Sequence, residues 1–229
     1  MTTIWHDLLH LFFPDLCLLC RKPLVEGEEE ICLHCLADLP RTGFDRTDPR
    51  NPVAALFLGK VEIESASAFL RYEKGGHVQS LIHDLKYHHG KKAGMLLGRL
   101  AALDYLESGG FEGVDLLLPV PLHPQKQRRR GYNQAEWIAK GIASVVPLPI
   151  DTTSLRRIRK TDTQTHRPLY QRWKNVQDVF TLTDRASLQN KHVLLVDDVI
   201  TTGSTLAACA ETLLKAPGIR VSVFGIGVA

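Results

Sequence analysis

The chain has 229 residues, 44% of them hydrophobic and 23% charged, a composition typical of a globular protein of one or two domains and not of a disordered chain. Asp, His, Arg or Pro interrupts each apolar stretch within about ten residues, which excludes a membrane-spanning helix of about 20 residues. The formal charge of +3 is unevenly distributed, because residues 119–175 carry 12 Lys or Arg against 3 Asp or Glu. This basic stretch predicts a polyanionic ligand, either a phosphate ester or a nucleic acid; a solvated basic face is the alternative.

The N-terminal segment is apolar but lacks the features of a secretory leader. It has no basic start and no small-residue cleavage site, and Asp7 interrupts its apolar residues. We therefore expect a short docking helix and a cytoplasmic protein. The apolar residues are Leu8, Leu9, Leu11, Phe12 and Phe13.

Four of the five cysteines form two Cys-x-x-Cys pairs, Cys17 with Cys20 and Cys32 with Cys35. This spacing is typical of a structural zinc site, in which each pair forms a knuckle and the four thiolates complete a tetrahedron. Such a closed site leaves no position for substrate, so the metal would stabilise a small module over residues 1–45. Disulfide pairing is the alternative, which a cytoplasmic location disfavours.

A linker rich in Pro, Gly and Asp is predicted over residues 40–52, and a second domain over residues 60–229, in which 60–110 form a hood-like or flanking region. Helices are predicted where apolar residues recur every three to four positions, and strands where they alternate or form short runs. In chain order the pattern predicts one or two strands within 62–72, helices over 75–87 and 93–106, a strand over 114–120, a helix over 133–146 with Asn133 as its N-cap, a strand over 193–196, a helix over 204–215 and a strand over 220–226. Strands that alternate with helices indicate an α/β fold with a parallel sheet.

The most informative segment is 193–205, in which a buried strand ends in Asp197 and Asp198 and a loop of hydroxyl residues and glycine leads into a helix. In open parallel sheets, ligands bind beyond the carboxyl ends of the strands. The backbone N–H groups of such a loop bind phosphate, and Gly203 allows the close approach. Two carboxylates beside a phosphate indicate that the ligand also presents hydroxyls or a metal, as ribose 5-phosphate does. The loop residues are Thr201, Thr202, Gly203, Ser204 and Thr205.

This segment resembles the binding motif for phosphoribosyl pyrophosphate (PRPP) of type I phosphoribosyltransferases at every motif position. Pro119, Val120 and Pro121 resemble the pyrophosphate-binding loop of that family, and the basic run over 128–134 follows it. Residues 156–175 lie where the family has a mobile loop over its active site. The resemblance therefore implies a type I phosphoribosyltransferase-like parallel sheet flanked by helices, joined to the N-terminal zinc-knuckle module.

From Phe13 onward the chain is similar to the ComF family of competence proteins. The resemblance is carried by the four-cysteine module and the segments at 85–87, 119–124 and 130–134, by Thr163, Gln164, Arg172 and Asn175, and by the Asp-Asp loop. It implies a role in handling incoming single-stranded DNA during natural transformation, together with the competence machinery.

The resemblance implies specific site residues. Asp197, Asp198 and Arg130 would form the catalytic set, and magnesium would bridge the pyrophosphate and the ribose hydroxyls. The other PRPP-binding residues would be the loop 201–205, Pro119, Val120, Pro121, Arg128, Arg129 and Lys86. As alternatives, Arg128 and Arg129 are solvated side chains and Lys86 is a surface charge.

Two functional hypotheses follow. In the first, the protein binds PRPP and transfers its phosphoribosyl group to an acceptor that the sequence does not identify. In the second, it is a non-catalytic module that binds single-stranded DNA on its basic face and retains the PRPP or nucleotide site as a sensor. Tyr132 or Trp137 would then stack on the bases.

Overall fold

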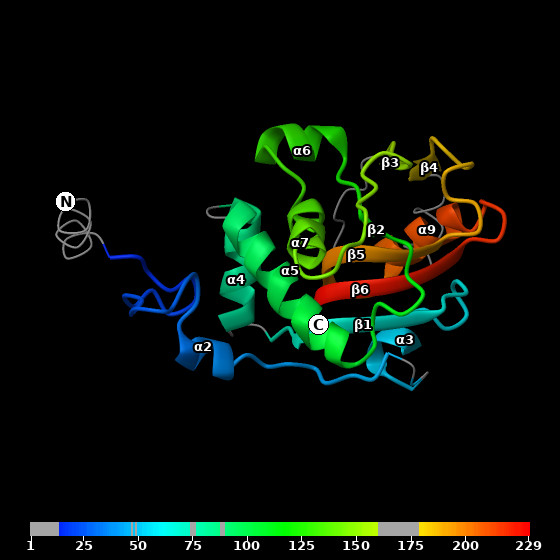
Figure 1. Cartoon of the computed structure of the whole chain (residues 1–229). Coiled ribbons are helices and arrows are strands. Elements are labelled where there is room, and N and C mark those ends of the chain that lie inside the picture. The colour runs from blue at the N-terminus through cyan, green and yellow to red at the C-terminus, as the bar shows by residue number, and fades with distance from the viewer. Residues whose placement is uncertain (1–13, 47, 49, 74–76, 88–89, 160–178) are drawn as a thin grey trace.

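The computed structural model describes residues 14–46, 48, 50–73, 77–87, 90–159 and 179–229, and it contains a four-stranded parallel sheet. The strands lie in the order β1 (Ser65–Arg71), β6 (Arg220–Val228), β5 (His192–Ile200) and β2 (Leu116–Pro119). Figure 1 shows this sheet at the centre of the molecule with helices around it. The predicted α/β fold is confirmed.

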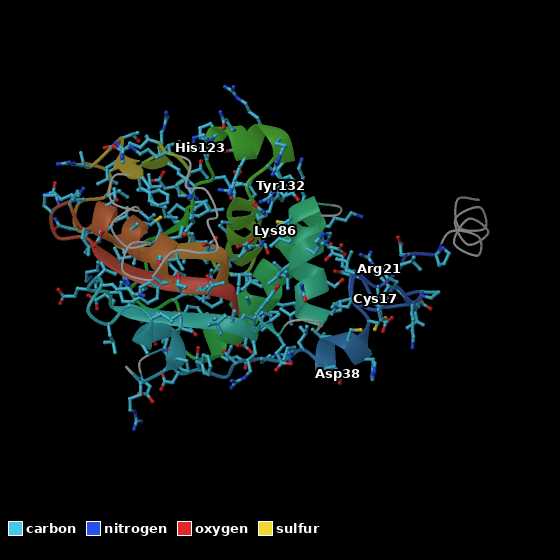
Figure 2. All side chains as sticks on the ribbon, turned by 180° about the vertical axis from the view of Figure 1, so that it is seen from behind. Cys17, Arg21, Asp38, Lys86, His123 and Tyr132 are labelled. Carbon is cyan, nitrogen blue, oxygen red and sulfur yellow. The ribbon has the colours of Figure 1, made fainter. Side chains whose placement is uncertain are left out.

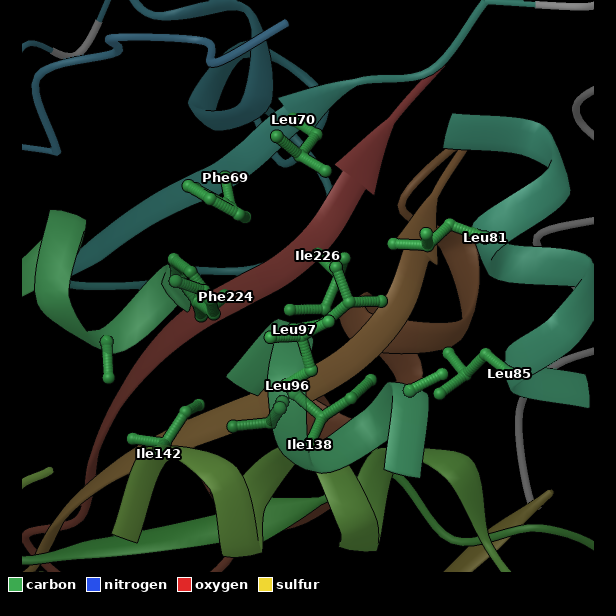
Figure 3. Close-up of a cluster of buried hydrophobic side chains, with 14 of the residues drawn as sticks. Phe69, Leu70, Leu81, Leu85, Leu96, Leu97, Ile138, Ile142, Phe224 and Ile226 are labelled. Carbon is green, nitrogen blue, oxygen red and sulfur yellow. The ribbon is translucent and has the colours of Figure 1, made fainter. Parts of the chain in front are cut away.

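Both faces of the sheet are covered by other elements. Successive residues of a strand point to opposite faces, so the buried residues of one strand divide between two clusters. Leu194 and Val196 of β5 belong to one buried cluster, and Val193 and Leu195 belong to the other. On the first face lie α4 (His77–Tyr87), α5 (Gly90–Glu107) and α7 (Gln134–Ala143); their leucines and isoleucines surround Ile226 of β6 (Figure 3). On the second face lie α3 (Pro52–Ala55) and α9 (Ser204–Leu213). Burial on both faces explains why β5 begins as a continuous apolar run.

The structure contains short elements that were not predicted, namely α2 (Leu33–Ala37), α3, β3 (Leu155–Arg157) and β4 (Phe180–Leu182), and it differs from the prediction in two further ways that bear on the site. Strand β5 continues beyond residue 196 through both aspartates to Ile200, because β6 continues to pair with it as far as Val228. The basic run forms a helix, α6 (Pro124–Arg130), that the apolar pattern did not predict. Its described residues are all at least partly exposed, so they show no apolar periodicity, whereas a Pro at its first position and Gly131 after its end are ordinary helix boundaries.

A short antiparallel pair, β3 (Leu155–Arg157) and β4 (Phe180–Leu182), lies beside α9. The predicted mobile loop over 156–175 lies outside the described residues from residue 160 onward. The predicted N-terminal docking helix also lies outside them.

The cysteine-bearing module contains α2 (Leu33–Ala37) and packs on the first face of the sheet domain through Leu18, Leu19, Ile31 and Leu39. The following stretch, predicted as a linker, runs along the open edge of β1. The Thr42 N–H donates to the Phe69 carbonyl at 2.9 Å, and the Arg71 N–H donates to the Pro40 carbonyl at 2.9 Å. Within the described part of the chain, no helix combines the length and the apolar character needed to cross a membrane.

Candidate functional site

The site lies at the carboxyl ends of the neighbouring strands β2 and β5. The connections that follow these two strands lead toward opposite edges of the sheet. After β2, the chain passes through α7 on the first face and returns outside β2, where Ile150 forms a parallel bridge with Leu117. After β5, it passes through α9 on the second face to β6 on the other side. Such a switch point opens a crevice between the two strand ends, the usual ligand position in parallel α/β sheets.

The registry of the strands places the two predicted motifs side by side. Pro119 pairs with Val196, and the Val120 N–H donates to the Val196 carbonyl at 2.9 Å. Pro119, Val120 and Pro121 therefore lie beside Asp197 and Asp198 at the strand ends.

The two carboxylates occupy different electrostatic surroundings, although both are largely buried. The Asp198 carboxylate forms an ion pair with Lys86 of α4, with 3.3 Å between Nζ and Oδ2. Burial, and then the charge of Asp198, raise the pKa of Asp197 to about 8, although the Asp198 N–H, Lys86 and Arg157 favour the carboxylate. At neutral pH the pair therefore retains a proton and carries less than two negative charges.

The loop after β5 leads directly into α9. Gly203 is the N-cap residue of α9 at φ +70°, a left-handed conformation that glycine adopts without steric cost. It has no side chain to cap the helix, and a Cβ there would lie 3.3 Å from Leu56 Cβ. The Thr202 and Ser204 hydroxyls lie 2.9 Å apart, so hydroxyl groups and the positive end of the helix dipole meet at this loop. Thr201 is exposed and Thr205 is partly exposed.

The predicted cations differ in position. Lys86 forms an ion pair with Asp198. Arg128 and Arg129 are exposed on α6, and Arg130 is partly buried near Tyr132. The Tyr132 hydroxyl donates to the Leu85 carbonyl at 2.7 Å, which ties the segment after α6 to the end of α4. Figure 2 shows Tyr132 and Lys86 on the same side of the molecule.

Two further cations were not singled out from the sequence as site residues. Lys60 Nζ donates to the Thr202 carbonyl at 2.9 Å, directly within the loop. Burial lowers the pKa of Arg157, and the neighbouring ionisable groups of Cys209 and Asp197 act against that shift. Arg157 was visible in the sequence as part of the basic stretch, but no local signal pairs it with Asp197.

The predicted aromatic residues also have defined surroundings. The hydroxyl of Tyr132 is bonded to α4, and burial raises its pKa. The ring of Trp137 lies under the Lys140 ammonium at 4.4 Å and the Lys91 ammonium at 5.3 Å. Cations therefore surround Trp137, on α7.

The four cysteines form a second centre, and Figure 2 shows Cys17 apart from Lys86. Their sulfur atoms all lie within 4.8 Å of one another, and none forms a disulfide. The Cys20 and Cys32 sulfurs are 3.8 Å apart, the separation that a tetrahedron with Zn–S bonds of about 2.3 Å requires.

Backbone N–H groups also favour the thiolate form in this cluster. Burial opposes ionisation of Cys17, but the N–H groups of Cys20, Cys32 and Leu19 lower its pKa to about 7. The pKa of Cys35 is raised by burial and by the neighbouring thiols, so the cluster needs a cation to hold four thiolates. The residues fit a structural metal such as zinc, held by Cys17, Cys20, Cys32 and Cys35.

Comparisons with known proteins agree with this geometry. Residues 129–226 match the family model described as "Phosphoribosyl transferase domain". The "DNA utilization protein YhgH" of Salmonella typhimurium is 29% identical over 224 residues, which cover 93% of this chain and 97% of that protein. "Competence protein F" of Haemophilus influenzae is 34% identical over 131 residues, 57% of each chain. "Competence protein ComFC" of Bacillus subtilis is 30% identical over 112 residues, 48% of this chain and 42% of that protein.

Solved structures give a weaker likeness. Adenine phosphoribosyltransferase from Saccharomyces cerevisiae has 13% identity and a TM-score of 0.38, over 66% of this chain and 73% of that one. We therefore assign the fold from the sheet topology and from the match to the family model.

Proposed function

The chain belongs to the ComF family and carries a type I phosphoribosyltransferase-like domain, and from this premise we propose that its site binds PRPP together with Mg²⁺. One observation carries the proposal: Asp197 and Asp198 lie on β5, the Gly203 loop follows that strand directly, and Lys86 reaches Asp198 from α4. A sugar phosphate matches this arrangement, because its hydroxyls suit carboxylates and its phosphate suits the loop.

In the proposed complex, Asp197 and Asp198 accept hydrogen bonds from the ribose hydroxyls. Residues 201–205 receive the 5-phosphate through their N–H and hydroxyl groups. The diphosphate extends toward the segment 119–121 and is neutralised by Lys86 and Arg130, with Arg128 and Arg129 adding longer-range positive charge. Mg²⁺ would be held beside Asp197 and Asp198 and would supply positive charge that offsets the charge of the diphosphate.

The reaction that we propose for this complex is transfer of the phosphoribosyl group to a nitrogen nucleophile. The bond between ribose C1 and the diphosphate oxygen breaks, and the diphosphate leaves with the electron pair. A bond forms between C1 and the nucleophile, which loses a proton to solvent. Positive charge develops at C1 in the transition state, so the protein's contribution is alignment and charge stabilisation by the aspartate pair.

Titration calorimetry with PRPP, with and without Mg²⁺, tests the binding. Replacing Asp197→Asn together with Asp198→Asn removes both carboxyl groups and the negative charge that they carry, and should weaken PRPP binding by about tenfold or more. Glu107→Gln, an exposed change on α5, is the control and should leave the affinity unchanged. If the unaltered protein does not bind PRPP at all, the proposal is wrong.

A second candidate function is the binding of single-stranded DNA. It is supported by the exposed side chains of Arg128 and Arg129 and by the names of two relatives, which refer to DNA utilization and competence. Replacing Arg128, Arg129 and Arg130 with Ala should abolish salt-sensitive binding of an oligonucleotide, measured by fluorescence anisotropy. The Asp197→Asn, Asp198→Asn variant should bind DNA normally if the basic face is the DNA site.

A further inference from the structure

The C-terminal turn of α4 is held by three different parts of the molecule through three consecutive residues. The buried Asp84 carboxylate pairs with the guanidinium of Arg21 in the cysteine module. The Leu85 carbonyl accepts the hydrogen bond from Tyr132. Lys86 forms the ion pair with Asp198 of β5. The position of this turn therefore depends on contacts outside the matched domain as well as within it.

Asp84 and Lys86 point away from each other. Two positions along an α-helix correspond to a rotation of about 200°, so the side chains project from opposite faces. Figure 2 shows Arg21 and Lys86 on opposite sides of α4 accordingly. A displacement of the turn on the module side would therefore displace Lys86 relative to Asp198 on the other side.

Arg21 is itself held in a fixed place by the first knuckle. It follows Cys20 directly, and its N–H donates to the Cys17 carbonyl at 2.9 Å. Its φ of +60° lies in the left-handed region, which costs energy for a residue with a Cβ and persists where surrounding contacts impose it. The knuckle thus presents the Arg21 side chain toward α4 from a constrained backbone.

Asp84 makes this contact consequential. Its side chain is 6% exposed, whereas that of Arg21 is 46% exposed. A buried carboxylate that loses its cationic partner is left with an uncompensated charge, which favours movement of the helix turn toward solvent. Arg99 of α5 also forms ion pairs with the module, with Glu29 at 3.0 Å and with Glu30 at 3.8 Å. These acids are more exposed than Asp84, and the pairs lie on α5 and not on α4.

We propose that Arg21 is a positioning residue of the PRPP site: by pairing with Asp84 it fixes the last turn of α4, and thereby the place where Lys86 meets Asp198 and the ligand's diphosphate. This inference rests on the proposed PRPP binding. It assigns the cysteine module a role in ligand affinity in addition to its own folding.

A double-mutant cycle read out by titration calorimetry with PRPP tests the coupling. Lys86→Met should weaken PRPP binding and affect ribose 5-phosphate much less, because only PRPP carries the diphosphate. Arg21→Met should weaken PRPP binding by roughly fivefold in the unaltered protein. In the Lys86→Met background the same change should have almost no further effect, because its influence passes through Lys86. Arg21→Lys, which keeps a cation near Asp84, should restore most of the affinity.

The matched control is Arg99→Met, which breaks an ion pair of the same module without contacting α4 and should leave the affinity for PRPP unchanged. If Arg21→Met folds poorly, the pair of changes Arg21→Met and Asp84→Asn removes the contact without leaving a buried charge. It should still weaken PRPP binding, but by less than Arg21→Met, because the turn loses its tether and carries no unpaired charge. Equal losses from Arg21→Met in both backgrounds, or no loss, would overturn the inference.

The failure of the proposed function is distinguishable from the failure of this inference. If the unaltered protein does not bind PRPP, the proposed function fails, and amide hydrogen exchange over residues 84–87 then decides the inference. Arg21→Met should accelerate exchange in this turn, and Arg99→Met should not. Unchanged exchange in both variants would refute the positioning role.

Discussion

At the scale of single residues, Asp197 combines a buried position with an adjacent negative charge. Its pKa is raised to about 8, first by burial and then by Asp198. In the unfolded chain the carboxyl releases its proton near pH 4. Between these two values the folded state holds a proton that the unfolded state has lost, so the free energy of unfolding decreases as the pH rises, by up to about 1.4 kcal/mol per pH unit.

We therefore predict that the stability difference between Asp197→Asn and the unaltered protein depends on pH. Asn cannot ionise, so the variant should gain in relative stability from about pH 4 to about pH 8 and then stay level. Urea unfolding of both proteins at a series of pH values measures this difference. The contributions of the other titratable groups are common to both proteins and cancel in the difference. A difference that is constant over this range would contradict the raised pKa.

Gly203 is a residue whose backbone and surroundings both exclude a side chain. We predict that Gly203→Ala lowers the free energy of unfolding by about 2 kcal/mol, because it combines a left-handed backbone with a Cβ 3.3 Å from Leu56. Gly131→Ala is the matched control, since Gly131 has φ +83° but no atom within 4 Å of an added Cβ. It should cost about 1 kcal/mol. Equal losses in urea unfolding would show that the contact with Leu56 is unimportant.

At the scale of elements, α7 is fastened to β2 by its N-cap. Asn133 Oδ1 accepts from the Ala135 N–H at 3.2 Å, and Nδ2 donates to the Val120 carbonyl at 3.0 Å in a buried position. One side chain thus caps the helix and fixes the segment that follows the strand. The sequence predicted the cap, and the structure confirms it; the bond to Val120 depends on the packing of α7 against β2.

We predict that Asn133→Ala lowers the free energy of unfolding by about 2 kcal/mol, because it removes the cap and leaves a buried carbonyl without its donor. Asn133→Asp keeps the oxygen that caps the helix but loses the N–H donor to Val120. In thermal unfolding its loss of stability should be no greater than that of Asn133→Ala. Gln125→Ala on the exposed face of α6 is the control and should change stability little. A loss below about 0.5 kcal/mol for Asn133→Ala would contradict this role.

At the scale of the whole molecule, the cysteine module packs on the same hydrophobic cluster as α4 and α5. Its four sulfurs hold the two knuckles together, and a metal would supply the positive charge that four thiolates need. Loss of the metal should therefore affect the module and the cluster that it covers.

We predict that the purified protein contains one zinc ion per chain by elemental analysis, and that Cys35→Ser loses it and unfolds at a lower temperature. Cys209→Ala should retain the metal, because Cys209 is buried in the cluster on the opposite face of the sheet. Retention of full zinc content by Cys35→Ser would refute the four-cysteine site.

Local patterns in the sequence were sufficient for the strands of the parallel sheet, for the longer helices that flank it and for the motifs. The apolar run before Asp197, the helical spacing of α5 and α7 and the N-cap Asn133 each follow from which side chains are buried, a property that repeats with the period of the element. The cysteine spacing and the Asp-Asp loop are equally local. Helix α6 was missed because an exposed basic helix has no apolar period, and β5 was predicted too short because pairing with β6, not burial, extends it.

The sequence by itself thus determined a parallel α/β protein with a thiol cluster and an Asp-Asp loop at the end of a strand, for which it predicted a sugar-phosphate ligand. Only the tertiary structure decided which cations meet the carboxylates: Lys86 pairs with Asp198, Lys60 reaches the loop, and Arg128 and Arg129 are exposed. The physical reason is that contacts between residues far apart in the chain depend on how helices pack on the sheet. No periodicity within α4 indicates that its last turn lies between the cysteine module and the strand ends.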